Sequence, residues 1–328
     1  MNFPATPIDL FQFPSMFRGD VQIFHANNLS TISYQQWIKP RGTSMSYFFL
    51  VGGGGGGGGG HQKPQNTNGG GGGGGGSACI SRLLIPSFLL PNTLYVKVGR
   101  GGLGGPVSAA GFSGVPSIVA TSPQSLPQIF GSNVGPLIVS DSGGNGGGGG
   151  GGGLVGNAGA GGIAGSPSSN VVPALTGLYS AVAGQAGGAG GAQTGAVGTS
   201  ITAWSIRPVS SGAGGAGIQA NASLFDFGGG SITAVSAFNF PKMNFPTDVG
   251  AVARGGDALA PKNGDSGVNF FDGPFLQSGG AGGASSFAGV AGNGGKGGIG
   301  CGGGGGGAGV TGGRGGDGGN GMVAIFSW

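Results

Sequence analysis

Nine consecutive glycines, Gly52 to Gly60, directly follow the apolar run YFFLV at residues 47–51. Further glycine-rich tracts recur along the chain, at 69–76, 143–153, 184–191, 212–217, 279–283, 292–300, 302–307 and 312–321. Glycine loses more backbone freedom on folding than any other residue, so an isolated tract of this kind is a random coil. The tracts therefore limit the chain to two outcomes, which are floppy linkers or an ordered structure held together from outside each tract.

Three features favour the ordered outcome. The tracts have comparable lengths, their few substitutions are mostly Ala or single Asn, and they recur after apolar strands. In the polyproline II conformation a nine-residue tract would span ~28 Å, and its N–H and C=O groups would have to bond laterally to neighbouring tracts. The sequence therefore predicts stacked polyglycine type II helices. Collagen is excluded because the strict Gly-X-Y spacing with abundant proline is missing.

Short apolar segments alternate with the tracts and read as strands near 46–51, 94–98 and 322–328. In LYVKV, Leu94, Val96 and Val98 lie on one face and Tyr95 and Lys97 on the other, as in a half-buried strand. We expect these segments to form one sheet gathered from distant parts of the chain. The predicted fold class is all-β with stacked polyglycine II helices, short strands in a sheet or sandwich, long loop inserts and little or no α-helix.

Composition narrows the choice of function. Of the 328 residues 89 are Gly, only 7% are charged, and none is Glu. The 13 Lys and Arg residues stand singly along the chain, so no cluster could neutralise several phosphates of a nucleic acid. A chain without Glu, with scattered Asp and two His, offers little for general acid–base chemistry. We therefore expect a non-enzyme without cofactor or metal, with no nucleic-acid partner and no membrane insertion.

Residues 1–32 differ from the remainder, because they are rich in Phe and Pro and almost free of glycine. Their aromatic residues are Phe3, Phe11, Phe13, Phe17 and Phe24. Two interpretations stay open: a strand that lies on the main domain, or a docking peptide that anchors the chain to a partner. The segment has no basic n-region and contains several prolines, so it does not resemble a signal peptide.

Residues 33–328 are predicted to form a glycine-rich β domain with loop inserts at 106–142, 166–183, 199–211, 218–254 and 257–278. The segment HQKPQNTN at 61–68 lies between two glycine tracts, which indicates a polar turn between antiparallel neighbours. Aromatic residues in the later inserts, with two asparagines of the turn, are the candidate contact residues: Phe225, Phe227, Phe238, Phe240, Phe245, Phe270, Phe271, Asn66 and Asn68. The alternative for each phenylalanine is packing against the domain or a neighbouring subunit.

Motifs with known chemistry are weak here. GDSGV at 264–268 places Ser266 where serine proteases carry a nucleophile, but the only histidines are His25 and His61, and no barrel is readable. GGRGGD at 312–317 matches half of a calcium-binding repeat in a single copy. Cys79 and Cys301 are far apart and in no CxxC spacing, so buried free thiols are favoured over a zinc site, with one long-range disulfide left open.

Three segments together resemble a known family. They are WIKPRGTSMSYFFLV at 37–51 with its polyglycine, SACISRLLIPSFLLPNTLYVKVGRGGLGG at 77–105, and GGDGGNGMVAIFSW at 315–328. The chain resembles the glycine-rich domain of phage tail and virion proteins over about residues 33–105 and 289–328. It resembles more loosely the adhesins at the long tail fibre tips of T-even-type phages. The inserts are longer here, and residues 1–32 match no fibre-attachment domain.

The resemblance implies a virion protein, made in the host cytoplasm, that binds a bacterial surface receptor through loops on a rigid polyglycine platform. The receptor would be a glycan or an outer-membrane protein. The N-terminal segment would bind other virion proteins, and the chain would form a homo-oligomer, which could be a trimer. The alternative is a capsid decoration, fibre or tail-tip subunit that has no receptor of its own.

Overall fold

The computed structural model describes residues 19–26, 34–64, 67–123, 136–144, 158–166, 178–203, 209–220, 226–234, 251–259, 262–270 and 276–328. This part of the chain is mostly β, and the helical segment with described bounds is the single 3-10 turn η3, Ser87–Leu89. No helix in it has the length and apolar character required to cross a membrane. The prediction of a β fold with little or no α-helix is confirmed for these residues.

Sixteen strands are present in the described residues. They are β1 Asp20–His25, β2 Gln35–Ile38, β3 Met45–Val51, β4 Ile80–Pro86, β5 Thr93–Lys97, β6 Ser117–Ala120, β7 Pro136–Ser140, β8 Tyr179–Val182, β9 Ile201–Ala203, β10 Ile232–Ala234, β11 Ala251–Ala253, β12 Asn269–Phe270, β13 Leu276–Gln277, β14 Ser286–Val290, β15 Gly309–Thr311 and β16 Met322–Ser327. Several of these strands lie within segments expected as loops: β6 and β7 in 106–142, β9 in 199–211, and β10 and β11 in 218–254. Runs such as SIVA, buried at every position, explain the difference because they pack as strands.

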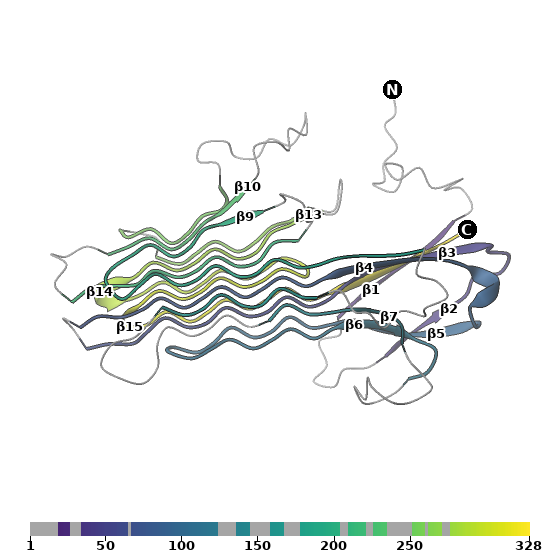
Figure 1. Cartoon of the computed structure of the whole chain (residues 1–328), viewed down its shortest axis with the longest axis horizontal. Helices are drawn as coiled ribbons and strands as arrows, with labels where there is room; N and C mark the ends of the chain where they lie inside the picture. Colours follow the sequence, from purple (N-terminus) through teal and green to yellow (C-terminus); the bar gives the residue numbers. More distant parts are fainter. Residues whose placement is uncertain are drawn as a thin grey trace, which may run out of the picture.

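Two antiparallel sheets form one end of the molecule, which we call the strand end (Figure 1). One sheet has the order β1-β16-β3-β4-β8 and the other has the order β2-β5-β6-β7. Residues of both sheets share one core, in which the rings of Trp37 and Phe48 meet edge to face with centroids 5.9 Å apart. Every second side chain of β3 and β4 enters this core, as the period of two predicts.

The expectation of one sheet is wrong for the segment 94–98. Strands β3 and β16 pair directly, but β5 pairs with β2 in the other sheet, where Leu94 lies opposite Trp37. The alternation of LYVKV is confirmed, since Leu94, Val96 and Val98 are buried and Tyr95 and Lys97 are half-buried. Alternation fixes which face of a strand is buried, but it carries no information about which sheet the strand joins.

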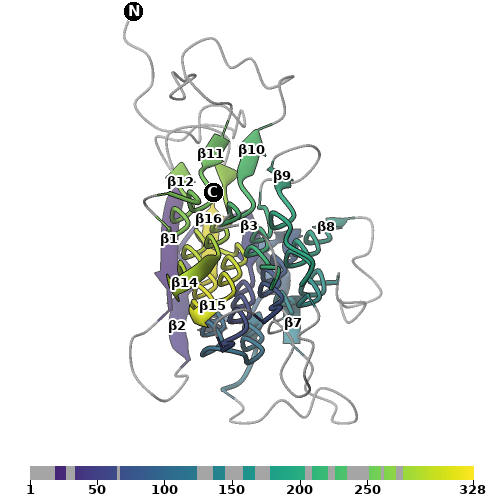
Figure 2. The same ribbon diagram turned by 90° about the vertical axis from the view of Figure 1, so that its left-hand side faces the viewer.

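From the strand end the glycine tracts run side by side along the long axis (Figure 1), and Figure 2 shows them end-on, packed in several rows. We call these segments the glycine layer. The tract 52–60 donates backbone hydrogen bonds to three neighbours in rotation. Gly54, Gly57 and Gly60 donate to the carbonyls of Gly319, Gly316 and Gly313, at 2.8 to 2.9 Å, while the residues between them bond to other segments.

Two further neighbours donate to the same tract. Gly102 and Gly105 donate to the carbonyls of Gly54 and Gly57, and Gly303 donates to that of Gly55. The tract is fully buried, although it carries no side chains at all. An ideal Cβ on Gly56 would lie 2.1 Å from the carbonyl oxygen of Leu103, which is backbone and cannot swing away. The spacing between tracts therefore requires glycine.

The tract after the turn runs back antiparallel to the first. Gly55, Gly58 and His61 donate to the carbonyls of Gly76, Gly73 and Gly70, at 2.8 to 3.0 Å. The prediction that residues 61–68 connect two antiparallel tracts is confirmed by this register. Residues 65 and 66 of the turn lie outside the described residues.

Side chains appear in the outer tracts at every third residue. Asn293 and Lys296 are exposed, and the half-buried Ile299 follows at the same spacing, while Gly292, Gly295 and Gly298 between them are buried. Several Asn and Asp side chains on these tracts accept a hydrogen bond from the backbone of the next segment. The pairs are Asn320 with Gly101 N, Asp317 with Gly104 N, Asn293 with Arg314 N and Asn263 with Asn293 N. Side-chain oxygens thus replace carbonyls at the surface of the layer.

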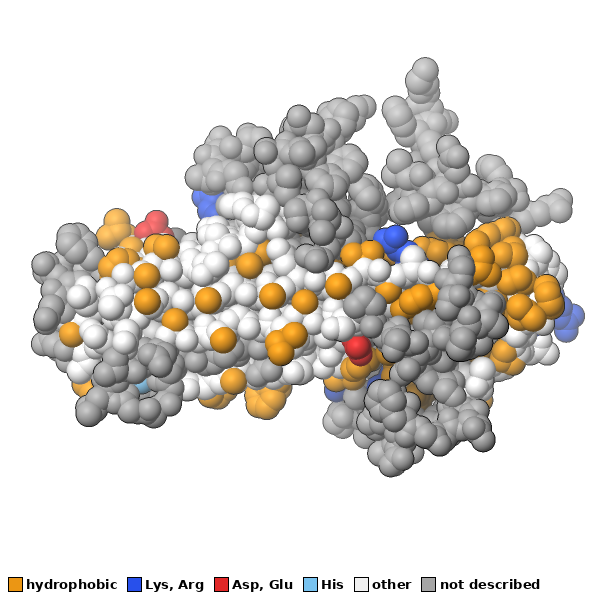
Figure 3. Space-filling view, viewed as in Figure 1, with side chains coloured by type: hydrophobic (Ala, Val, Ile, Leu, Met, Phe, Trp, Pro, Cys, Tyr) orange, Lys and Arg blue, Asp and Glu red, His pale blue; other side chains and the backbone are white. Residues whose placement is uncertain are grey.

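The two regions also differ on the face shown in Figure 3. Hydrophobic side chains gather over the strand end, whereas the glycine layer shows mostly backbone and uncharged polar groups, with separate hydrophobic groups between them. Serine hydroxyls connect the regions: Ser117 Oγ donates to the carbonyl of Val51 at 2.7 Å and accepts from Gly99 N at 2.9 Å. A strand can therefore continue into a glycine tract without leaving buried backbone groups unpaired.

Candidate functional site at the far end of the glycine layer

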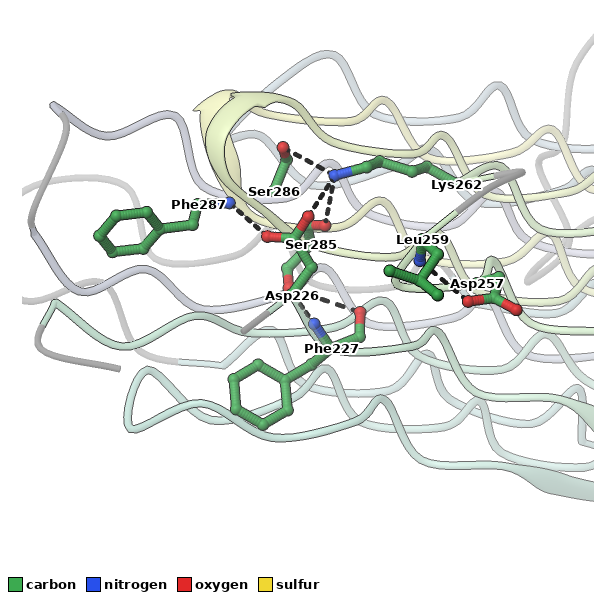
Figure 4. A network of polar contacts seen from close by, with 8 residues as sticks. All are labelled: Asp226, Phe227, Asp257, Leu259, Lys262, Ser285, Ser286 and Phe287. Carbon is green, nitrogen blue, oxygen red and sulfur yellow. Dashed lines mark hydrogen bonds and ion pairs between the residues drawn. The ribbon is translucent and has the colours of Figure 1, made fainter. Parts of the chain in front are cut away.

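The far end of the glycine layer carries the parallel pair β14 and β15 (Figure 1). Beside β14 lies a polar cluster built from residues of three separate segments (Figure 4). Asp226 precedes a glycine tract, Lys262 comes from the segment that follows β11, and Ser285 and Ser286 lie where a tract passes into β14. We call this set the end cluster.

Asp226 and Lys262 form the centre of the end cluster. Lys262 Nζ pairs with Asp226 Oδ2 and donates to Ser286 Oγ at 2.8 Å and to the carbonyl of Ser285 at 3.4 Å. Asp226 Oδ1 accepts the backbone N–H of Phe287 at 2.6 Å. Both carboxylate oxygens and the ammonium are thus bonded within the protein, and the pair ties two other segments to the start of β14.

Phe227 lies next to this pair and is half-buried. Its backbone exchanges hydrogen bonds with Ser285, from Phe227 N to Ser285 Oγ at 2.8 Å and from Ser285 N to the Phe227 carbonyl at 2.9 Å. Its ring covers Gly195, where an added Cβ would lie 2.7 Å from the ring. Gly195 also has a φ of +81°, which glycine adopts without strain. The backbone of Phe227 is therefore fixed, and part of its ring lies against Gly195.

Lys63 enters the same region from the turn after the first tract. Its backbone N–H donates to the carbonyl of Gly309 at 2.9 Å, which fixes the turn beside β15. The side chain is 2% exposed, and its Nζ lies 5.2 Å from the centroid of the Phe287 ring. Burial lowers the pKa of the Lys63 ammonium, and the negative charge of Asp226 acts in the opposite direction.

Of the predicted contact residues the structure places three. Phe227 lies next to the end cluster and bonds to Ser285. Asn68 Oδ1 accepts the backbone N–H of Ala220 at 2.6 Å, so this amide holds two segments together. Phe270 lies in β12, opposite Leu276 of β13. The others, Phe225, Phe238, Phe240, Phe245, Phe271 and Asn66, lie outside the described residues.

The predicted anchor is placed in one position. Residues 20–25 form β1, which pairs with β16 at the edge of the five-stranded sheet, as one of the two interpretations of the leader expects. Phe24 is 8% exposed and belongs to the core of the strand end. Phe3, Phe11, Phe13 and Phe17 lie outside the described residues.

The residues of the weaker motifs have structural partners. Asp265, next to Ser266, accepts the backbone N–H of Arg254 at 3.1 Å. Asp317, the acid of GGRGGD, bonds to Gly104 N and lies 3.5 Å from Lys296 Nζ. Among the residues described here no three His, Cys, Asp or Glu side chains gather as metal ligands do. Cys79 and Cys301 are both buried and free, as favoured from sequence.

Lys63, Lys262, Asp226 and Phe287 were not singled out from the sequence. Asp226 and Lys262 are 36 residues apart, and no strand or helix periodicity relates them, so only the folded structure brings them together. For Lys63 a weak signal exists, because it is the only charged residue in a turn enclosed by glycine.

The tract 292–300 carries a stronger sequence signal. Its long side chains recur at every third residue, and this spacing indicates which side of the tract faces outward.

Comparison with known proteins agrees with the architecture at a coarse level. A family model described as a glycine-rich domain matches residues 29–147, which include β2 to β7 and the first two glycine tracts. These residues are a glycine-rich domain. No curated protein matches the chain.

Proposed function

We propose that the chain is a phage virion protein and acts as a host-receptor-binding adhesin on a rigid platform of polyglycine II helices. The observation that carries the proposal is the hydrogen-bonded glycine layer, which joins a side-chain core at one end to the end cluster at the other. A chain that fixes loops so far from its core is suited to presenting them to a partner. Binding groups on rigid supports lose little entropy when a partner is bound.

Two observations support polyglycine II as the conformation of the tracts. Hydrogen bonds from the tract 52–60 rotate among neighbours with a period of three residues, and burial in 292–300 follows the same period. A polyproline II type helix has three residues per turn and no internal hydrogen bonds, so every group points to a neighbour in turn. The narrow coils of the end-on view in Figure 2 fit this geometry.

The resemblance to the glycine-rich domain of phage tail and virion proteins supplies the biological setting of the proposal. In this setting the receptor is a glycan or an outer-membrane protein, and the leader, through Phe3, Phe11, Phe13 and Phe17, attaches the chain to other virion proteins. The chain works by binding and catalyses no reaction. Its location is the virion, and it is made in the host cytoplasm.

Two measurements test this proposal. Antibodies against the chain, detected by immunogold on intact particles, should label the distal tip of a tail or fibre. The purified chain should bind host cells and reduce phage adsorption. A chain that neither binds cells nor reduces adsorption is not an adhesin.

A structural subunit is the second candidate, favoured by apolar side chains exposed at the strand end. Val21 and Ile23 of β1, Ile38 of β2, and Phe88 and Leu89 of η3 are between 39% and 81% exposed. Contact with other copies or other virion proteins would bury these side chains, which fits a homo-oligomer such as a trimer. In this case immunogold labels the capsid or the shaft of a fibre, and adsorption is unaffected by added protein.

A further inference from the structure

We propose that Lys63, beside the end cluster, binds an anionic group, a carboxylate or a phosphate, carried by a surface glycan. This inference rests on the proposed receptor-binding function and names the chemistry of the receptor. Its basis is one buried cation without a hydrogen-bond partner, beside an ion pair whose two members are bonded to each other and to β14.

The neighbouring ion pair makes no hydrogen bond to Lys63, whose Nζ has no partner among the described residues. Asp226 uses one oxygen for Lys262 and the other for the backbone N–H of Phe287. Lys262 in turn has Asp226, Ser286 and the carbonyl of Ser285 as acceptors. The three side-chain charges sum to one positive charge, and this surplus belongs to Lys63.

Lys63 itself is almost completely buried, and its Nζ has no hydrogen-bond partner among the described residues. An ammonium carries three N–H donors, and the ring of Phe287 attracts its charge without accepting those donors in ordinary hydrogen bonds. Burying such a group without a partner is costly, and folded proteins rarely retain one without a reason. A bound anion would supply the missing acceptors and the missing negative charge.

The position of Lys63 lets a ligand reach it. Its two chain neighbours, Gln62 and Pro64, are both exposed, so the buried Lys63 lies between two surface residues of the turn. A lysine side chain has several rotatable bonds, and rotation about them brings the ammonium to solvent. The half-buried ring of Phe287 beside it offers an apolar surface for the ring of a sugar. The ammonium of Lys63 and the ring of Phe287 together favour a glycan with an anionic substituent.

The test uses the full-length chain and three small probes: galacturonate for a sugar carboxylate, glucose 6-phosphate for a sugar phosphate, and neutral galactose. Binding is followed by calorimetry and by the rise in melting temperature that a ligand of the native state produces. We expect one or both anionic probes to bind at millimolar concentrations and galactose not to bind. The stronger of the two anionic probes identifies the source of the charge.

Variants assign the effect to Lys63. Lys63→Met keeps the length of the side chain and should weaken anion binding by about 10-fold or more, the usual loss for a charge-assisted hydrogen bond. Its melting temperature should equal or exceed that of the wild type, because an unpaired buried charge is removed. Lys63→Arg should retain binding. The matched control Lys296→Met removes an exposed lysine paired with Asp317 and should bind like the wild type.

The outcomes separate this inference from the adhesin proposal. If no anionic probe binds, or if Lys63→Met binds as well as the wild type, the anion site is wrong. The adhesin proposal survives that result when the purified chain still blocks adsorption. If the probes bind through Lys63 but the chain neither binds cells nor blocks adsorption, the anion site stands, and its assignment to a receptor glycan is overturned.

Discussion

At the strand end the interior consists of side chains: Trp37, Phe48, Leu83, Leu94 and their neighbours fill the space between two sheets. In the glycine layer the interior consists of backbone, and a tract such as 52–60 is buried without any side chain. The first region gains stability from apolar area removed from water, and the second from lateral hydrogen bonds between closely spaced chains. The comparison teaches that segments without hydrophobic side chains can still form a long buried interior, provided that glycine lets their backbones approach closely.

Replacing a buried glycine should have the largest effect. Gly56→Val adds a branched side chain where a Cβ alone would lie 2.1 Å from the Leu103 carbonyl oxygen, so neighbouring tracts must separate. We expect a loss of more than about 4 kcal/mol of unfolding free energy, or no folded protein. The control is Gly289→Ala, where the nearest atom to the added Cβ is Ser286 Oγ at 3.4 Å. Chemical denaturation measures both, and equal stabilities would show that the tract tolerates separation.

A cavity in the side-chain core should have the second largest effect on stability. Phe48 is fully buried and packs against Trp37, so Phe48→Ala should cost about 3–5 kcal/mol through lost burial and the space left behind. Hydrogen exchange on this variant sharpens the comparison, because the amides of β3 should lose more protection than those of the distal part of the glycine layer. A uniform loss along the molecule would instead mean that the two regions unfold as one unit.

Alkaline pH probes the two buried thiols. Burial raises the pKa of Cys79 from 9.0 to about 11 and raises that of Cys301 as well. Thiols with a raised pKa in the folded state contribute stability that is complete below pH 9 and is lost as the pH rises through the folded value. Cys79→Ala should therefore reduce the alkaline loss by up to about 2–3 kcal/mol at pH 11. Urea denaturation at pH 8 and pH 11 measures this loss of unfolding free energy. An equal loss in the variant and in the wild type would contradict the raised pKa of Cys79.

The surface of the glycine layer should give the smallest effect. Asp317→Ala removes the acceptor for the backbone N–H of Gly104 at a half-exposed position, where water partly replaces it. We expect a loss of about 0.5–1.5 kcal/mol. Arg314→Ala, at an exposed position on the same tract, serves as control and should change stability by less than about 0.5 kcal/mol. Thermal unfolding of the two variants side by side measures the difference.

Much of the fold could be predicted from the sequence, for identifiable reasons. The alternation in LYVKV fixed its buried face, and the position of HQKPQNTN between two tracts fixed their antiparallel return. The membership of β5 in the second sheet could not be predicted, because pairing with β2 depends on contacts between Trp37 and Leu94 that no local pattern records. The strands hidden in the inserts were missed because runs such as SIVA are too short to distinguish from apolar loops.

Less of the end cluster could be predicted from the sequence. Phe227 was chosen for its aromatic ring, but its neighbours Asp226 and Lys262 acquire meaning only when the tracts bring their ends together. The spacing of Asn293, Lys296 and Ile299 was a usable signal, since these longer side chains recur at every third residue while the glycines at 292, 295 and 298 are buried.

Hydrogen exchange of the amides of Gly53 to Gly60 tests the central claim most directly, namely that the glycine tracts are ordered structure held by lateral hydrogen bonds. Each of these amides donates to a carbonyl of another segment, at 2.8 to 3.0 Å. We expect protection comparable to that of the amides of β3, which the same tract continues. Exchange at the rate of an unstructured peptide, with β3 still protected, would contradict the account and make the tract a linker.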